Sequence, residues 1–496
     1  MKKNILRGSR VKRSSKRAND FISSIGFDSP IAKQVVSINM AHMLSLLKSK
    51  EVEDEVGTAC LGFLLGLPKD MHLDAGTEDV HHMVEQDAIG AIGIDKAGYM
   101  NLGKSRNDQV ATALRMETRV RLLDLAEALT GVQRALVSLI RTQGRLPMPG
   151  YTHLQHAQPV TVAHHLQGYV EAVQRDFDRI VGAYRRVNLS PMGAAALAGT
   201  SVRIDRDYIA SLLGFEGLAK NAMDAVSSRD FALESLSIAT IAMVNLSRMA
   251  EELILWSSQE FGFVEIADEY SATSSIMPQK KNPVVAETIR AKCGSILGEL
   301  TAAIAITKAL PNSYNLDLQE VTPHLWRGMG GATESASMMS AMLSSLKFNK
   351  RSLEAALEDD KSTATELANV LTRAHGVPFR QAHAIVGQLV RIAVDGGKPL
   401  TAVAEAYLPE VSKRVAGKAV KIDKDELGRT LDALKTLRMN RSAGGANPLL
   451  LPRLLSEDSD SVEGNSSWIA MARGSLVHAE DRLMEEARRA KGVRTK

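Results

Sequence analysis

The sequence is poor in aromatic residues and in cysteine. Phe, Trp and Tyr make up 4% of its 496 residues, while hydrophobic residues together make up 45%. The core must therefore be aliphatic, which favours helix packing because strands prefer aromatic and β-branched residues. Cys60 and Cys293 are too few for a disulfide framework, and neither has the companions of a metal site. We expect a reduced, cytoplasmic setting.

Membrane and nucleic-acid signals are also weak. No uncharged apolar stretch reaches the length of a membrane span, and no signal-peptide run follows the basic N-terminus. The net charge is only +4, which argues against a polyanionic partner. The basic segment 1–20 could form a nucleic-acid arm, but it lacks interleaved aromatics, so we favour a solvated tail along an acidic neighbour. We expect a soluble protein that binds neither membrane nor nucleic acid.

Glycine and proline are scarce over several long segments. Residues 106–142 contain one Gly and no Pro, 229–261 contain neither, and 284–310 contain almost none. Within 162–187 apolar residues recur at steps of three and four, at Val162, Leu166, Tyr169, Val173, Phe177, Ile180, Tyr184 and Val187. Such stripes on very long helices, wider than a heptad seam, indicate an elongated helical bundle.

We predict an all-α fold with three helical units. An elongated central bundle, residues 104–356, is flanked by a smaller N-terminal domain, residues 1–103, and a C-terminal domain, residues 357–496, where the helices shorten and charges increase. We find no internal repeat. The segment "SEDSDSVEGNSS" (456–467) is interpreted as a polar turn.

The connections between the long helices carry functional groups that short bundle loops do not need. They read "GYMNLGKSRNDQ" (98–109), "MPGYTHLQHAQP" (148–159), "SPMGAAALAGTS" (190–201) and "SATSSIMPQKKNP" (271–283). Pro278 and Pro283 exclude a helix in the last of these, because proline lacks the amide hydrogen. Polar loops on a rigid scaffold are the usual place for a site.

The residue types in these loops suit acid/base chemistry on a polycarboxylate. Lysines 104, 280 and 281 and Arg106 supply positive charge, several hydroxyl and amide side chains can orient carboxylates, and His153 can transfer protons near neutral pH. No metal-ligand spacing, glycine-rich phosphate loop or G-x-S-x-G nucleophile elbow is present. We therefore expect neither a metal nor a cofactor.

Several of these motifs resemble a known family. "SSIMPQKKNP" (274–283) is similar to the fumarase/aspartase superfamily signature, approximately GSSxMPxKxNP. Five further motifs resemble the argininosuccinate lyase branch: "KSRNDQVAT", "MPGYTHLQHAQPVT", "LAGTSVRIDR", "NAMDAVSSRDF" and "YNLDLQE". The segment "ATELANVLTRAHGVPFRQAH" (364–383) resembles the C-terminal domain of that branch. The likeness runs from about residue 20 to beyond residue 470. It implies β-elimination of argininosuccinate to arginine and fumarate, in a homotetramer whose sites are each built from three subunits.

The resemblance also implies residue roles. Ser274 is the base, Lys280 stabilises the developing charge and Asn282 holds the same carboxylate, while the second lysine, Lys281, is structural or solvated. Thr152 and His153 match the family's Thr–His pair, and His153 would assist protonation of the departing guanidino nitrogen or orient the group that does. Further substrate contacts are matched by Ser24, Asp28, Asp79, His81, Ser105, Arg106, Asn107, Tyr314 and Gln319. Removing a proton beside a carboxylate creates a doubly charged species, so a desolvated base and concentrated positive charge are needed.

The sequence departs from the branch pattern in the substrate-contact loops. Asn101, Leu102 and Lys104 stand where the branch has His, Thr and Arg, and further departures are Thr273 for Gly, Thr322 for Lys and Val35 for Asp. None of these departures replaces the matched base, lysine or histidine. They therefore bear on the identity of the substrate more than on the type of reaction. Two alternatives stay open: a related fumarate-releasing lyase such as adenylosuccinate lyase, and an inert, crystallin-like relative.

Overall fold

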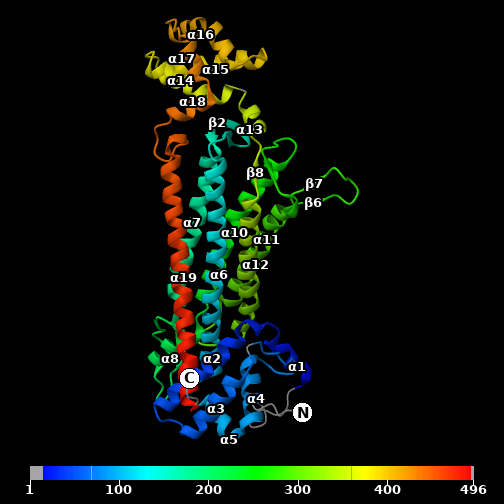
Figure 1. Ribbon diagram of the computed structural model, residues 1–496, viewed down its shortest axis with the longest axis vertical. Helices are drawn as coiled ribbons and strands as arrows, with labels where there is room; N and C mark the ends of the chain where they lie inside the picture. The colour runs from blue at the N-terminus through cyan, green and yellow to red at the C-terminus, as the bar shows by residue number, and fades with distance from the viewer. Residues whose placement is uncertain (1–14, 69, 359, 493–496) are drawn as a thin grey trace.

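The computed structural model describes residues 15–68, 70–358 and 360–492, so most of the basic N-terminal segment lies outside the described residues. The molecule is a long helical bundle with a cluster of shorter helices at each end (Figure 1). The bundle helices are α6 (Arg106–Gln143), α7 (Val162–Val187), α10 (Asp230–Ser257), α11 (Val284–Thr307), α12 (Asp317–Ser344) and α19 (Leu451–Ala490). The predicted all-α bundle is therefore confirmed.

Local sequence signals explain where the long helices begin. The Ser105 side chain accepts a hydrogen bond from the amide of Asn107, and Asp108 accepts one from the amide of Ser105, which forms a capping box at the start of α6. Thr161 caps α7 through the amide of His164. The apolar stripe predicted over 162–187 lies on the buried face of α7, so the periodicity identified this helix correctly.

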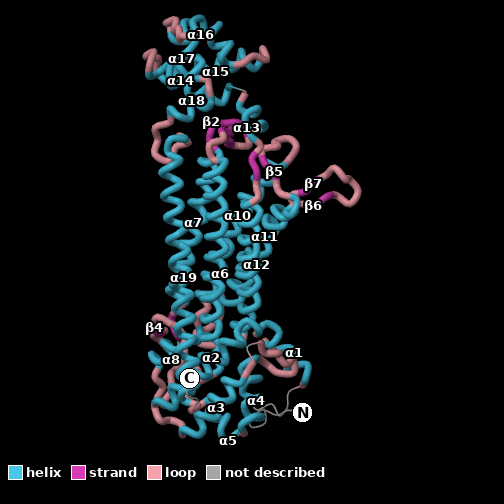
Figure 2. The backbone as a smooth tube through the Cα atoms, viewed as in Figure 1, coloured by secondary structure: helices cyan, strands magenta, loops and turns pink. Residues whose placement is uncertain are grey.

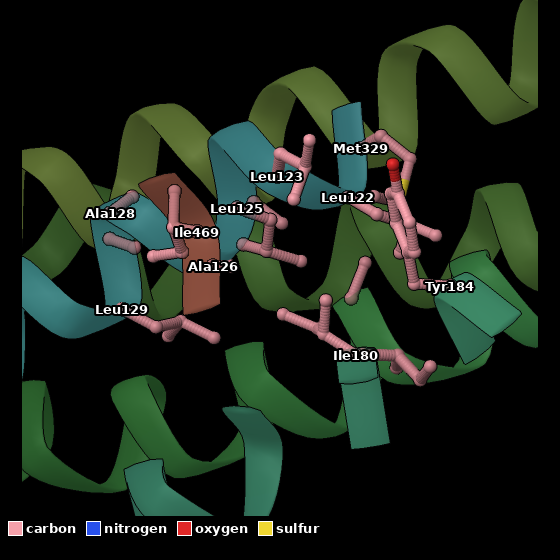
Figure 3. Packing of buried hydrophobic residues seen from close by; sticks show 14 of the residues in the cluster. Leu122, Leu123, Leu125, Ala126, Ala128, Leu129, Ile180, Tyr184, Met329 and Ile469 are labelled. Atoms are coloured by element: carbon pink, nitrogen blue, oxygen red, sulfur yellow. The ribbon is translucent and has the colours of Figure 1, made fainter. Parts of the chain in front are cut away.

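The core of the bundle is aliphatic, as the composition predicts. Figure 3 shows side chains of α6 that pack with side chains of α7, α12 and α19, among them Leu122, Leu125, Ile180, Met329 and Ile469. These five are no more than 6% exposed. Burial of each such side chain stabilises the fold by about 1.5–3 kcal/mol.

The prediction of a polar turn at 456–467 is wrong, because this segment lies inside α19. Asp458, Val462, Asn465 and Ile469 follow one another at helical spacing and are buried on one face. Asn465 donates to Gln133 and Gln174, which lie on α6 and α7, at 2.9 Å each. The buried face of α19 is thus partly polar and binds polar partners in the interior. A search for apolar periodicity therefore cannot detect this part of the helix.

Shorter helices form the two ends of the molecule. The N-terminal end holds α1 (Lys16–Ile22), α2 (Ala32–Lys48), α3 (Asp54–Gly66), α4 (Val80–Ile92) and α5 (Ile94–Ala97), with α8 (Arg206–Leu212) beside α2 and α19. The opposite end holds α13 (Lys350–Leu357), α14 (Ala364–Arg373), α15 (Phe379–Asp395), α16 (Leu400–Ala416), α17 (Lys424–Thr430) and α18 (Ala433–Met439). Residues 367–431 contribute a separate hydrophobic cluster, whereas α19 runs back along α6. The domain boundaries near residues 103 and 356 stay predictions.

The strands are short and pair in twos (Figure 2). They are β1 (Pro147–Thr152) with β2 (Gln155–Thr161), β3 (Leu189–Ser190) with β4 (Gly217–Leu218), β5 (Val264–Glu265) with β8 (Lys347–Phe348), and β6 (Ala272–Thr273) with β7 (Lys281–Asn282). Only β3 and β4 are parallel. Among the described residues, no helix combines the length and apolar character that crossing a membrane requires.

Candidate functional site

The predicted site residues fall in three separate places. The first group lies at the N-terminal end of the bundle and comprises Ser24, Asp28, Asp79, His81, Ser105, Arg106, Asn107, Tyr314 and Gln319. The second is the turn between β1 and β2, with Thr152 and His153. The third is the arm formed by β6 and β7, with Ser274, Lys280 and Asn282, which stands out from the bundle (Figure 2).

Helix α6 keeps the first two groups apart. It starts in the first group, and β1 follows its far end. With 38 residues, α6 is roughly 57 Å long at 1.5 Å per residue. One chain therefore does not bring its carboxylate-binding candidates to its own Thr152 and His153.

Hydrogen bonds and ion pairs connect the first group. Arg106 lies 2.8 Å from the carboxylate of Asp79, which also caps α4 through the amide of His82. The side chain of Gln319 donates to the carbonyl of Ile22 at 3.0 Å, which joins α12 to the segment before Ser24. Tyr314 is near the cations Arg229 and Arg106: burial raises the pKa of its phenol, and these cations act in the opposite direction.

Two ionisable groups here are shifted towards their neutral forms. Burial raises the pKa of Asp28 to about 7, although Asp28 accepts hydrogen bonds from the Val80 amide at 3.0 Å and the Ser24 hydroxyl at 2.9 Å. Burial also lowers the pKa of His81 to about 4, so its imidazole is uncharged at neutral pH. His81 therefore binds as a neutral group if it contacts substrate.

Replacing Asp28 with Asn tests the buried carboxyl. A folded-state pKa raised from 3.8 to about 7 means that the stability from the neutral acid is fully present below about pH 4. That contribution is lost as the pH rises through about 7. We expect the free energy of unfolding of the wild type to fall over this range relative to Asp28→Asn. Urea unfolding of both proteins at pH 5, 7 and 8.5 measures the difference, and parallel pH profiles would refute the shift.

The second group sits on a strained turn. His153 and Leu154 both have φ of +56° and connect Thr152 to its strand partner Gln155. Two consecutive left-handed residues are typical of a type I′ hairpin turn, which favours Asn and Gly over His and Leu. The turn fixes His153 in a backbone conformation that an unconstrained histidine rarely adopts, as is common at functional sites.

Replacing Leu154 with Gly should therefore stabilise the protein. Leu154 is 66% exposed, so little packing is lost, and relief of the left-handed strain contributes roughly 1 kcal/mol after the entropic cost of glycine. Met471→Gly is the matched control, because Met471 is 65% exposed but lies in the interior of α19, where glycine costs about 1 kcal/mol. Thermal unfolding should show shifts of opposite sign, and a destabilised Leu154→Gly would contradict the strain.

The third group places a serine oxygen between backbone amides. Ser274 Oγ accepts hydrogen bonds from the amides of Ile276 at 3.3 Å and Met277 at 3.1 Å. The amide of Ser274 donates to the carbonyl of Lys280 at 3.3 Å, which ties the two ends of the loop together. Hydrogen bonds donated to an oxygen favour its anionic form, so this loop geometry suits a serine that acts as a base.

The two lysines of the arm differ in their partners. Lys281 Nζ lies 2.6 Å from Asp268 and 3.9 Å from Glu265. Lys280 is exposed and makes no ion pair within the described part of the chain. Its ammonium is therefore available to an anionic substrate, whereas Lys281 is neutralised by the protein.

Sequence reasoning missed some features of these groups. The amide pair around Ser274 Oγ was not foreseen, because backbone donors carry no sequence signal. Asn39 and Glu85 were missed as well; they line a cavity with His81 and Arg106, but sequence reasoning gave them no role. The described residues contain no cluster of three or more His, Cys, Asp or Glu that could hold a metal ion.

Comparison with known proteins identifies relatives over nearly the whole chain. Residues 28–298 match the family model described as "Lyase", and residues 361–433 match "Argininosuccinate lyase C-terminal". The argininosuccinate lyase of Methanothrix thermoacetophila is 44% identical over 486 residues, which covers 97% of this chain and 98% of the relative. That of Methanothermobacter thermautotrophicus is 42% identical, over 90% of this chain and 96% of the relative.

Solved structures agree on the fold. An EDDS lyase in complex with formate superposes with a TM-score of 0.89 at 27% identity, covering 97% of this chain and 96% of the other. A class II fumarase from Schistosoma mansoni gives a TM-score of 0.67 at 18% identity, covering 82% of this chain and 90% of the other. The second likeness supports the fold alone.

Proposed function

The chain belongs to the argininosuccinate lyase family, and from this premise we propose that it splits argininosuccinate into arginine and fumarate by β-elimination, a reaction of arginine biosynthesis. The observation that carries the proposal is the arm at 272–282. It holds the Ser274 oxygen between two backbone amides and presents the unpaired ammonium of Lys280 in the same loop. An inert, crystallin-like role would leave this pairing of base and cation without a use.

The proposed reaction uses the three groups in sequence. Ser274, as alkoxide, removes a proton from the carbon beside a substrate carboxylate, and Lys280 and Asn282 hold that carboxylate as its negative charge doubles. The adjacent C–N bond then breaks, and the electron pair of the carbanion forms the double bond of fumarate. Thr152 and His153 deliver a proton to the departing guanidino nitrogen of arginine. Proton exchange with solvent restores the serine and the histidine.

The N-terminal group is proposed to bind the ends of the substrate. Arg106 suits bidentate carboxylate binding, with Ser105 and Asn107 beside it. Ser24, Asp28, Asp79, His81, Tyr314 and Gln319 complete this part of the site. No cofactor or metal takes part in the proposed reaction.

We infer that the working unit is a homotetramer with shared active sites. Because α6 separates the first two groups within a chain, a complete site needs residues from neighbouring copies. The bundle surface supports this arrangement: α11 buries only Ala286, Ile289, Ile296 and Ala303, and exposed apolar side chains follow α10, α11 and α12 at Ile241, Val244, Leu297, Ile304 and Met338. Apolar surface of this kind is commonly covered by a further protein chain. We place the assembly in the cytoplasm.

A fumarate-release assay tests the proposal directly. Fumarate absorbs in the ultraviolet, so adding argininosuccinate to the purified protein should raise the absorbance, and adenylosuccinate should not. Release from adenylosuccinate alone would favour the related lyase. No release from either substrate would favour the inert relative.

A further inference from the structure

A polar cavity extends beyond the N-terminal group. Its volume is about 200 Å³, and it lies between α2, α4 and the start of α6. Its walls include Asn39, Glu85, Asn101, Lys104, Arg106 and Gln109. Arg106 and His81, which also lines the cavity, are shared with the proposed substrate site, but Glu85, Asn39 and Lys104 have no role in it so far.

Lys104 presents an ammonium group whose protein partner is neutral. Its Nζ donates to Oδ1 of Asn39, and the described residues provide no ion pair for it. The nearby Asp108 is already engaged, because its carboxylate accepts hydrogen bonds from the amides of Ser105, Gly193 and Ala195 at 2.8–3.1 Å. Burial lowers the pKa of Lys104 to about 8, as expected for an underpaired cation.

The other charges of the cavity complete the pattern. Arg106, unlike Lys104, has carboxylate partners, in Asp79 at 2.8 Å and Glu78 at 3.2 Å. The Glu85 carboxylate, in contrast, makes no hydrogen bond or ion pair with another described residue; its charge attracts Lys104 only through space and so opposes the effect of burial on the Lys104 pKa. A cation and an anion without a direct ionic partner among the described residues therefore line the same small cavity, and amide side chains line it as well.

We propose that this cavity binds the zwitterionic end of an α-amino acid, with its carboxylate on Lys104 and its ammonium on Glu85. Asn39 and Asn101 supply neutral hydrogen-bonding groups beside the two charges. A ligand with both charges provides a partner for Lys104 and for Glu85, whereas a simple anion or a simple cation would leave one of the two charges without a partner. The inference rests on the proposed function. Such a ligand can be either the arginine half of the substrate or a separate free amino acid.

Calorimetric binding of L-arginine and two truncated analogues tests the inference. Agmatine lacks the carboxylate, and argininic acid lacks the ammonium. We expect Lys104→Met to lower the affinity for L-arginine at least about tenfold, the scale of a lost charged hydrogen bond. The affinity for agmatine should not change. Glu85→Gln should lower the affinity for L-arginine by a similar factor and leave the affinity for argininic acid unchanged. Lys96→Met, an exposed lysine paired with Glu55 outside the cavity, is the control and should bind like the wild type.

The two sources are separated by kinetics. If the cavity holds the arginine half of the substrate, both variants also raise KM for argininosuccinate; if it holds a separate amino acid, KM stays constant and L-alanine binds in a Lys104-dependent way. Lys104→Arg, which keeps the charge, should retain binding if Lys104→Met fails to fold. Equal L-arginine affinity in the wild type and both cavity variants, or no L-arginine binding by the wild type, would overturn the inference. Neither result depends on whether the wild type releases fumarate.

Discussion

Replacing Ser274 with Ala is expected to lower kcat for fumarate release by at least ~10²-fold, the scale of a lost general base. The reason lies in the surroundings of the hydroxyl. The amides of Ile276 and Met277 donate to Ser274 Oγ, and the positive charge of Lys280 lies in the same loop. These interactions favour the alkoxide, and alanine removes the atom on which they act. Initial rates of fumarate formation at saturating argininosuccinate measure the loss.

Ser275 provides the matched control for this experiment. It is the next residue of the arm and is exposed, and its hydroxyl takes no part in the amide contacts of Ser274. Ser275→Ala should retain kcat within about threefold, since surface substitutions away from special features have small effects. Equal activity of Ser274→Ala and wild type would remove Ser274 as the base. Equal, large losses in both variants would point to the shape of the loop instead.

The second large effect is expected for Lys280→Met. Negative charge on the substrate carboxylate grows as the proton leaves, so an ammonium group beside it stabilises the transition state more than the bound substrate. We expect kcat to fall by about 10²–10³-fold, comparable to removal of an oxyanion donor. KM should change much less. Steady-state kinetics on argininosuccinate separates the two parameters.

Lys281→Met distinguishes a local charge effect from a general one. Its ammonium is bound to Asp268 at 2.6 Å in an exposed ion pair, and pairs of this kind contribute about 0–1 kcal/mol. We expect kcat for Lys281→Met within about threefold of wild type. If the two variants lose activity equally, the total charge of the arm matters more than the position of Lys280.

Much of the fold could be predicted because helix periodicity is local. The stripe at 162–187 follows α7 from end to end, since that helix buries one apolar face. The start of α19 was missed, because Asp458 and Asn465 lie on its buried face and bind partners on other helices. Those partners are distant in sequence, so no local sequence pattern predicts these contacts.

In the candidate site, too, some features could be predicted from local sequence and others depend on contacts between distant residues. Motifs such as "SSIMPQKKNP" identify side chains, and from them the base and its lysine are named. The left-handed backbone of His153 and Leu154, the two amides at Ser274 Oγ and the unpaired Glu85 depend on three-dimensional structure. Sequence reasoning could not distinguish Lys280 from Lys281 by physical argument either, until the contact between Lys281 and Asp268 assigned one of them to the protein.

The sharing of each site between subunits can be measured by mixing two inactive variants. Ser274→Ala keeps a normal His153, and His153→Asn keeps a normal Ser274, so a hybrid assembly can contain intact sites only if the two residues come from different chains. In an equal mixture that reassociates at random, one site in four receives both intact residues, which predicts about one quarter of wild-type activity. The measurement is fumarate release by the reassociated mixture. Recovery near that level supports a site pooled from several chains, and activity no greater than the sum of the two separate variants would contradict a site that takes Ser274 and His153 from different chains.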